Sequence, residues 1–79
     1  MKFKKELGYT LINVKTGLFP DFNGYESNGF SSWKGVDGPK EVISELKCYS
    51  MKYNNIQSRK VKKNLKNYRV AKLIVECQK

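Results

Sequence analysis

One amphipathic helix limits the fold of this chain more than any other feature. Between Asp37 and Tyr53, apolar side chains recur at helical spacing and form one stripe, which consists of Val42, Ile43, Leu46, Tyr49 and Tyr53. Asp37 or Gly38 suits the N-cap position and Pro39 the first helical position. Asn54-Asn55 can end the helix, because Asn tolerates the left-handed conformation. The other segments must provide the apolar surface that this stripe covers.

Strand-like alternation appears near both ends of the sequence. Phe3 to Val14 places Phe3, Leu7, Tyr9 and Leu11 on one face. Tyr68 to Cys77 carries apolar residues on both faces, which favours a central position in a sheet. We expect the helix stripe to pack on apolar side chains of these two strands, namely Leu7, Tyr9, Leu11, Leu73 and Val75.

The middle of the chain predicts shorter elements. Lys15-Thr16-Gly17 can connect two hairpin strands, and Pro20 makes the return segment, residues 18–22, an edge strand or a bend. Residues 23–38 interleave turn formers with aromatic residues, so we expect one short strand near residues 29–33. Residues 58–67 fit a helical turn after a Ser58 cap, and a basic loop or strand nearly as well.

These elements predict an α+β fold, with a small, mostly antiparallel sheet of three to four strands and one main helix packed on one face. The 79 residues are expected to form a single domain, residues 1–79. A domain of this size buries roughly 60% of its unfolded surface and has little stability to spare. Self-association is one remedy, so the sequence leaves a homodimer open.

The formal charge of +9 is unevenly distributed. Residues 46–75 contain nine cations and no acid, whereas residues 1–45 contain six of each. Such asymmetry favours an anionic partner, either nucleic acid or an acidic protein surface, over a cationic surface that only keeps the protein soluble. Lysine outnumbers arginine by seven to two in this stretch, which favours contact with a phosphate backbone over base-specific readout.

Two kinds of side chain are therefore candidates for partner or nucleic-acid binding. Tyrosines among cations can stack on bases, although Tyr49 and Tyr53 also fit the core side of the helix. Trp33 fits either an anchor on the core or a binding hot spot. The predicted binding residues are Lys52, Arg59, Lys60, Lys62, Lys63, Lys66, Arg69, Tyr53 and Trp33.

Catalytic and metal-binding chemistry finds little support in the sequence. There is no His and no Cys-x-x-Cys pair, and Cys48 is expected beside the buried face of the helix. Glu41 and Glu45 are better explained by a solvated helix face than by a metal site. We expect neither enzyme activity nor a cofactor. No apolar run approaches the roughly 18 residues of a membrane span, and no secretory leader follows Met1, so we expect a cytoplasmic protein with reduced thiols.

The layout resembles that of small phage-encoded accessory proteins. It begins with a hairpin strand, here residues 8–17, continues through an aromatic, glycine-rich middle at residues 29–33, and closes with a helix and a strand at residues 70–76. Some proteins of this type are anti-CRISPR or other counter-defence inhibitors, and some of those occupy a nucleic-acid channel of a host complex. The resemblance implies a non-catalytic inhibitor that docks on a host protein or nucleoprotein complex in the host cytoplasm. The alternative is a module that binds DNA or RNA directly and without sequence specificity.

Overall fold

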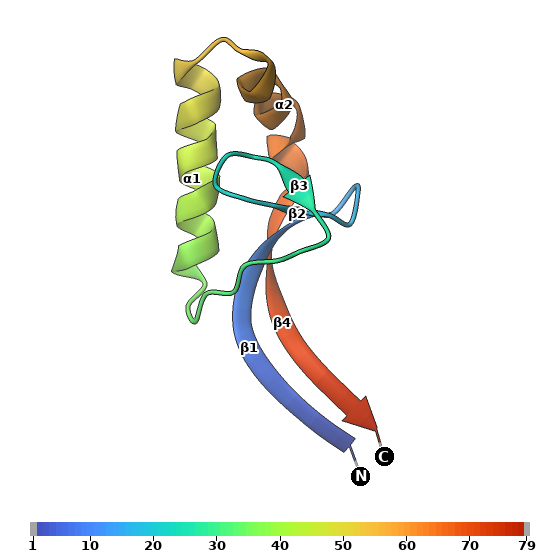
Figure 1. Ribbon diagram of the computed structural model, residues 1–79. Coiled ribbons are helices and arrows are strands. Elements are labelled where there is room, and N and C mark those ends of the chain that lie inside the picture. Colours follow the sequence, from blue (N-terminus) through green and yellow to red (C-terminus); the bar gives the residue numbers. More distant parts are fainter. Residues whose placement is uncertain (1, 79) are drawn as a thin grey trace.

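The computed structural model describes residues 2–78 and has an α+β fold (Figure 1). Its strands are all antiparallel and form two separate sheets of two strands each, β1 with β4 and β2 with β3. The elements in chain order are β1 (Lys2–Asn13), β2 (Phe19–Pro20), β3 (Glu26–Ser27), α1 (Asp37–Lys52), α2 (Ile56–Asn64), the 3-10 helix η1 (Leu65–Asn67) and β4 (Tyr68–Gln78).

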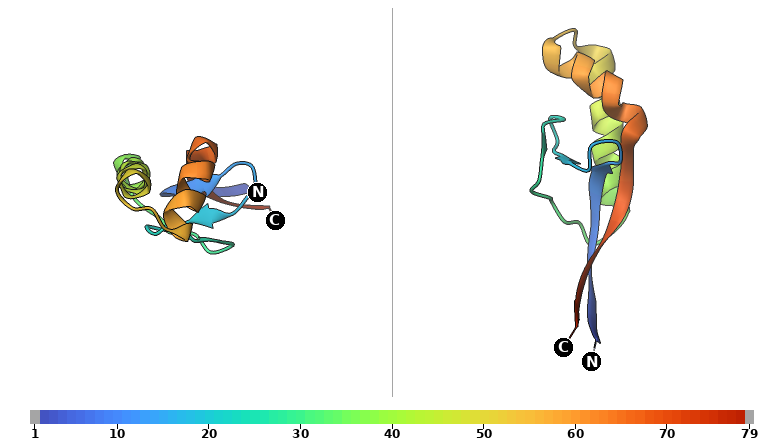
Figure 2. Two further views of the ribbon diagram at one scale, coloured as in Figure 1. Left: turned by 90° about the horizontal axis from the view of Figure 1, so that it is seen from above. Right: turned by 90° about the vertical axis from the view of Figure 1, so that its right-hand side faces the viewer.

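The molecule is elongated, with principal extents of 52 × 22 × 17 Å. β1 and β4 form one long, curved ribbon, and both helices lie beside the same end of it (Figure 1). The other half of the ribbon extends past the helices to the N- and C-terminal ends, as the right-hand view of Figure 2 shows. The helices therefore cover only part of the ribbon.

The core lies where the helical end meets the ribbon. It consists of Leu11, Val42, Leu46, Val61 and Tyr68, with Trp33, Ile43 and Leu65 partly buried against it. This confirms the first three residues of the predicted helix stripe, Val42, Ile43 and Leu46. The stripe leaves the core toward the end of α1, because Tyr49 is half-buried and Tyr53 is 47% exposed.

The predicted sheet of three to four strands with one main helix is wrong. β4 was expected in a central position, yet among residues 2–78 it pairs with β1 alone, and Ile74 and Val75 are each 43% exposed. The reason lies in the middle of the chain. Pro20 has no backbone N–H and the neighbouring residues form turns, so β2 and β3 are two residues long and pair with each other.

The short strand expected near residues 29–33 is replaced by a single bridge between Trp33 and Tyr9. The Tyr9 N–H donates to the Trp33 carbonyl oxygen at 2.6 Å, and the Trp33 N–H donates to the Tyr9 carbonyl oxygen at 2.8 Å. This close approach occurs beside a bulge at Leu7 in β1. Gly8, at φ +115°, allows it, because a Cβ there would overlap the Trp33 carbonyl group.

The helix boundaries correct two further expectations. α1 begins at Asp37 with Val36 as its N-cap, so Pro39 occupies the third helical position. Asn55 is extended rather than left-handed and caps α2 instead of ending α1. Its side-chain oxygen accepts the Ser58 N–H at 2.7 Å, and Ser58 Oγ accepts the Asn55 N–H at 2.9 Å. This reciprocal pair is a capping box. Residues 58–67 are helical, in α2 and η1, but the expected Ser58 cap is wrong, because Asn55 is the N-cap and Ser58 the third helical residue.

Candidate functional site

The cations of α2 and η1 fall largely on one side of the helix. Residues spaced by three, four and seven positions share a face, and four exposed cations have this spacing. We name them the basic face: Arg59, Lys62, Lys63 and Lys66. The opposite side of α2 buries Ser58 and Val61, which anchor the helix on the core.

The basic face carries charge that no acid neutralises within residues 2–78. The one ion pair in this part of the chain joins Lys72 Nζ to Glu6 Oε1 at 3.4 Å, on the ribbon. Two acids of the segment that precedes the helices, Asp21 and Glu26, accept hydrogen bonds from groups other than the cations of α2. Asp21 accepts the N–H groups of Asn23 and Tyr25. Glu26 accepts hydrogen bonds from the side chains of Asn13 and Thr16.

Arg69 extends the basic face at the junction of η1 and β4. Its Nη1 donates to the carbonyl oxygens of Lys66, at 2.6 Å, and Tyr68, at 2.8 Å. A cation at the C-terminal end of a helix is favoured, because the last carbonyl groups carry partial negative charge. These bonds hold the exposed Arg69 next to Lys66.

Lys60 lies on a different side of α2, together with Gln57 and Asn64. These three residues line one wall of an open hollow, whose other wall comes from the loop between β1 and β3, with Thr16, Leu18, Gly24, Tyr25 and Glu26. Lys60 therefore lies beside this loop, and it also lines a second hollow together with Arg59 of the basic face.

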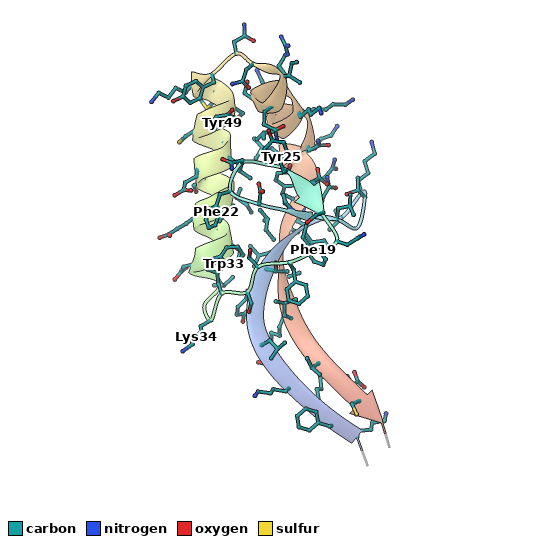
Figure 3. The ribbon with its side chains drawn as sticks, viewed as in Figure 1. Phe19, Phe22, Tyr25, Trp33, Lys34 and Tyr49 are labelled. Atoms are coloured by element: carbon teal, nitrogen blue, oxygen red, sulfur yellow. The ribbon has the colours of Figure 1, made fainter. Side chains whose placement is uncertain are left out.

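The loop at Gly24 docks on α2 and positions Tyr25. Gln57 Nε2 donates to the Asn23 carbonyl oxygen at 2.9 Å. Gly24, at φ +82°, lies so close to Val61 that a Cβ would overlap its side chain. As a result Tyr25, which is 62% exposed, also lines a second hollow with Tyr49, Asn55, Ile56, Gln57, Arg59 and Lys60. Figure 3 shows Tyr25 and Tyr49 on this side of the helical end.

Tyr25 is an exposed aromatic residue beside α2 that the predicted set of binding residues omits. The sequence contains a signal for it, since Asn23-Gly24 is a turn that can present the following side chain. What the sequence does not reveal is that this turn docks on α2, near Arg59 and Lys60.

Lys52 and Tyr53 lie at the C-terminal end of α1. Lys52 Nζ is 5.4 Å from the centre of the Tyr53 ring, which is a cation–π distance. The Tyr53 and Tyr49 rings are 5.0 Å apart. The Tyr49 hydroxyl accepts the Asn55 side chain at 3.1 Å, which links this pair to the first turn of α2.

Trp33 lies near the N-terminal end of α1, as Figure 3 shows. Tyr53 follows the C-terminal end, and the 16 residues of α1 span about 24 Å at 1.5 Å per residue. Trp33 is half-buried, packs edge-on against Phe22 at 6.0 Å, and its ring lies within 2.5 Å of where a Cβ on Gly38 would stand. The structure thus gives Trp33 an anchoring position and does not bring it to the basic face.

Tyr68 presents an unusual hydroxyl group beneath this region. The residue is 3% exposed, and its hydroxyl has no hydrogen-bond partner among residues 2–78. Burial raises the pKa of Tyr68 to about 12, with smaller contributions from the negative charges of Glu26 and Asp21. The group is therefore neutral at physiological pH.

The cysteines and acids form no metal-binding cluster among the described residues. No group of three or more His, Cys, Asp or Glu side chains within residues 2–78 lies close enough to hold a metal ion. Cys48 was expected beside the buried face of α1 but is exposed, because its position in the helix turns it away from Leu46 and the core. None of the helices in this part of the chain has the length and apolar character needed to cross a bilayer.

No family model, curated protein or solved structure matches this chain.

Proposed function

We propose that the chain is a non-catalytic binding protein whose basic face docks on phosphate groups of a nucleoprotein complex. One observation supports this most strongly. Four cations project from one side of a helix that is capped and anchored in the core, and no acid of residues 2–78 pairs with them. Such a surface presents a fixed positive field to an anionic partner.

Phosphate groups fit this surface better than other anions. α2 rises by about 13 Å over its nine residues, and duplex DNA carries one negative charge per roughly 1.7 Å of its axis. Several phosphates therefore lie within reach of the four side chains at once. Three of the four are lysines, which act as point charges and suit backbone contact without base readout.

The biological role that we propose is inhibition. The layout resembles that of phage counter-defence proteins, and a small basic protein that covers the nucleic-acid surface of a host complex blocks that complex without chemistry of its own. The site of action under this proposal is the host cytoplasm.

A pull-down with two charge-reversed variants tests the proposal. The basic-face variant is Arg59→Glu/Lys62→Glu/Lys63→Glu. The charge-matched variant, Lys34→Glu/Lys40→Glu/Lys47→Glu, reverses three exposed lysines outside the basic face. Each lowers the formal charge of +9 by six units. We expect the wild type and the charge-matched variant to retain a nucleoprotein complex from a bacterial lysate, and the basic-face variant to lose it.

Treatment with nuclease separates the kinds of partner. Release of the complex on nuclease digestion supports docking on nucleic acid. Capture that survives digestion indicates an acidic protein surface and contradicts the proposed phosphate contacts.

Direct binding of free single-stranded nucleic acid is a second candidate, favoured by the position of Tyr25. Tyr25 is exposed and lines hollows with Arg59 and Lys60, and single strands bind where bases stack on aromatic rings while cations follow the backbone. For this candidate, Tyr25→Ala should weaken binding of a labelled single-stranded oligonucleotide by about 5- to 150-fold in fluorescence anisotropy. Phe30→Ala, which removes another exposed aromatic residue, is the control. Equal affinity of all three proteins argues against stacking on Tyr25.

A further inference from the structure

The outer edge of β4 has no backbone partner within the described part of the chain. β4 pairs with β1 along one edge from Tyr68 to Gln78, and the hydrogen bonds outside the ladder involve no backbone group of residues 69–78. The half of the ribbon that contains residues 72–76 extends away from both helices (Figures 1 and 2). Ile74 and Val75 remain 43% exposed there. An exposed apolar edge strand is a template for another strand.

The sequence of this edge is complementary to itself. Lys72-Leu73-Ile74-Val75-Glu76 has opposite charges at equal distances from Ile74. When two copies pair antiparallel about Ile74, Lys72 of each copy stands opposite Glu76 of the other. Leu73 then stands opposite Val75 and Ile74 opposite its own equivalent. Directly opposite residues share a face and interact, so every cross-strand pair is either oppositely charged or apolar.

β1 continues the charge pattern across the ribbon. Lys4 is the ladder partner of Glu76. In the paired arrangement Glu76 therefore lies between Lys4 of its own chain and Lys72 of the second copy. In the single chain, Lys72 forms an exposed ion pair with Glu6. Because an exposed ion pair contributes little free energy, Lys72 can exchange Glu6 for a new partner.

The outer edge of β1 is a poorer template. The first half of β1 contains three lysines, Lys2, Lys4 and Lys5, and one acid, Glu6. Self-pairing there would bring excess positive charge together. The bulge at Leu7 and the bridge from Tyr9 to Trp33 interrupt the same edge. Lysines and bulges are features that protect edge strands from pairing.

We propose that a second copy of this chain pairs with β4 in antiparallel orientation about Ile74 and forms a symmetric dimer with a continuous sheet of four strands, β1–β4–β4–β1. The dimer axis lies at the end of the molecule opposite α2, so both basic faces stay accessible. This inference stands apart from the proposed function, because it involves no residue of the basic face.

A charge-exchange experiment tests the pairing. In sedimentation velocity, the wild type should show a species of about twice 9.2 kDa at concentrations up to about 1 mM, at which even a weak complex forms. Lys72→Glu and Glu76→Lys should each be monomeric over the range in which the wild type is dimeric, since each places like charges opposite each other twice. Each change should weaken the dimer by at least about tenfold.

An equimolar mixture of the two variants should form a dimer again. In the heterodimer, both cross-strand pairs join one lysine to one glutamate. Glu45→Lys and Lys47→Glu, at exposed positions of α1, are the matched controls and should each dimerise as the wild type does. Glu6→Gln removes the existing ion pair with Lys72 and should also leave the dimer intact.

Far-UV circular dichroism of each variant establishes that the variants fold. A folded wild type that remains a 9.2 kDa monomer overturns the proposal, whether its edge stays open or accepts a different chain. Single variants that still dimerise, or folded variants that fail to associate on mixing, overturn the pairing about Ile74.

Discussion

At the scale of single residues, the buried hydroxyl of Tyr68 lowers the stability of the fold. Its ring is part of the core, yet its hydroxyl is buried without a hydrogen-bond partner in the described part of the chain, and its pKa is raised to about 12. A buried polar group that forms no hydrogen bond loses its interactions with water and gains none in return, which costs about 1–3 kcal/mol.

Tyr68→Phe should therefore leave the protein equally stable or stabilise it by about 1 kcal/mol at neutral pH, because the ring stays and the unpaired hydroxyl goes. Urea unfolding followed by circular dichroism measures the change in the free energy of unfolding. A loss of stability greater than about 1 kcal/mol would show that the hydroxyl has a hydrogen-bond partner in solution.

Alkaline pH gives a second prediction for the same group. The folded-state pKa of about 12 lies above the ordinary value of 10.0, so folding favours the neutral form. The corresponding stability is fully present below pH 10 and is lost as the pH rises from 10 to about 12. The loss amounts to about 2–3 kcal/mol, at 1.36 kcal/mol per pKa unit.

Urea unfolding of the wild type and of Tyr68→Phe across this pH range isolates the effect, since both proteins share the lysines and the other four tyrosines that titrate there. The stability difference between the two proteins should shift in favour of the Phe variant as the pH rises. A difference that is independent of pH would contradict the raised pKa.

At the scale of elements, α2 determines how the cations are displayed. Its nine residues are polar and basic apart from Ile56 and Val61, and its first turn has no acid to interact with the dipole. A helix this short is marginal by itself. The Asn55–Ser58 capping box and the packing of Val61 stabilise it instead.

Asn55→Ala should destabilise the protein by about 1 kcal/mol, because the first turn of α2 loses its side-chain cap. Asn54→Ala is the matched control, since it changes the neighbouring exposed Asn, which forms no cap. Thermal unfolding followed at 222 nm compares the two. Equal melting temperatures of the two variants would mean that the capping box contributes nothing.

The elements that hydrophobic pattern predicted best are the long ones. α1, β1 and β4 lie within one or two residues of their predicted bounds. The apolar stripe of α1 and the alternation of the strands report local preference, which these elements follow. The sequence does not decide between a helix, a loop and a strand for residues 58–67, because their two apolar residues, Val61 and Leu65, are too few to indicate a period.

It was harder to predict which elements pack against which than to predict the elements themselves. Apolar residues on both faces of β4 suggested a central strand, but the middle of the chain forms turns and a docked loop instead of further long strands. The candidate site shows the same limit. Spacing along α2 can group Arg59 with Lys62, Lys63 and Lys66, whereas the approach of Tyr25 depends on the contact between Gly24 and Val61, two segments far apart in sequence.

At the scale of the whole molecule, two surfaces lie at opposite ends of an elongated body. The basic face lies at the helical end, and the edge of β4 that we propose for self-pairing lies on the ribbon that extends away from the helices (Figure 1). Trp33 and Tyr53, both predicted binding residues, are separated along α1, so the predicted set does not form a single site. In the proposed function, binding of the partner depends on the position of the cations and not on the net charge of +9.

The most direct test is the salt dependence of oligonucleotide binding by the wild type, the basic-face variant and the charge-matched variant, measured by fluorescence anisotropy. Each phosphate contact changes the slope of log K against log salt concentration by about −0.7 for single strands and −0.9 for duplex DNA. We expect a slope near −3 on single strands for the wild type and the charge-matched variant, from about four contacts. The basic-face variant should bind weakly and with a shallow slope. Equal weakening of both variants, or no binding by the wild type at low salt, would contradict the assignment of binding to the basic face.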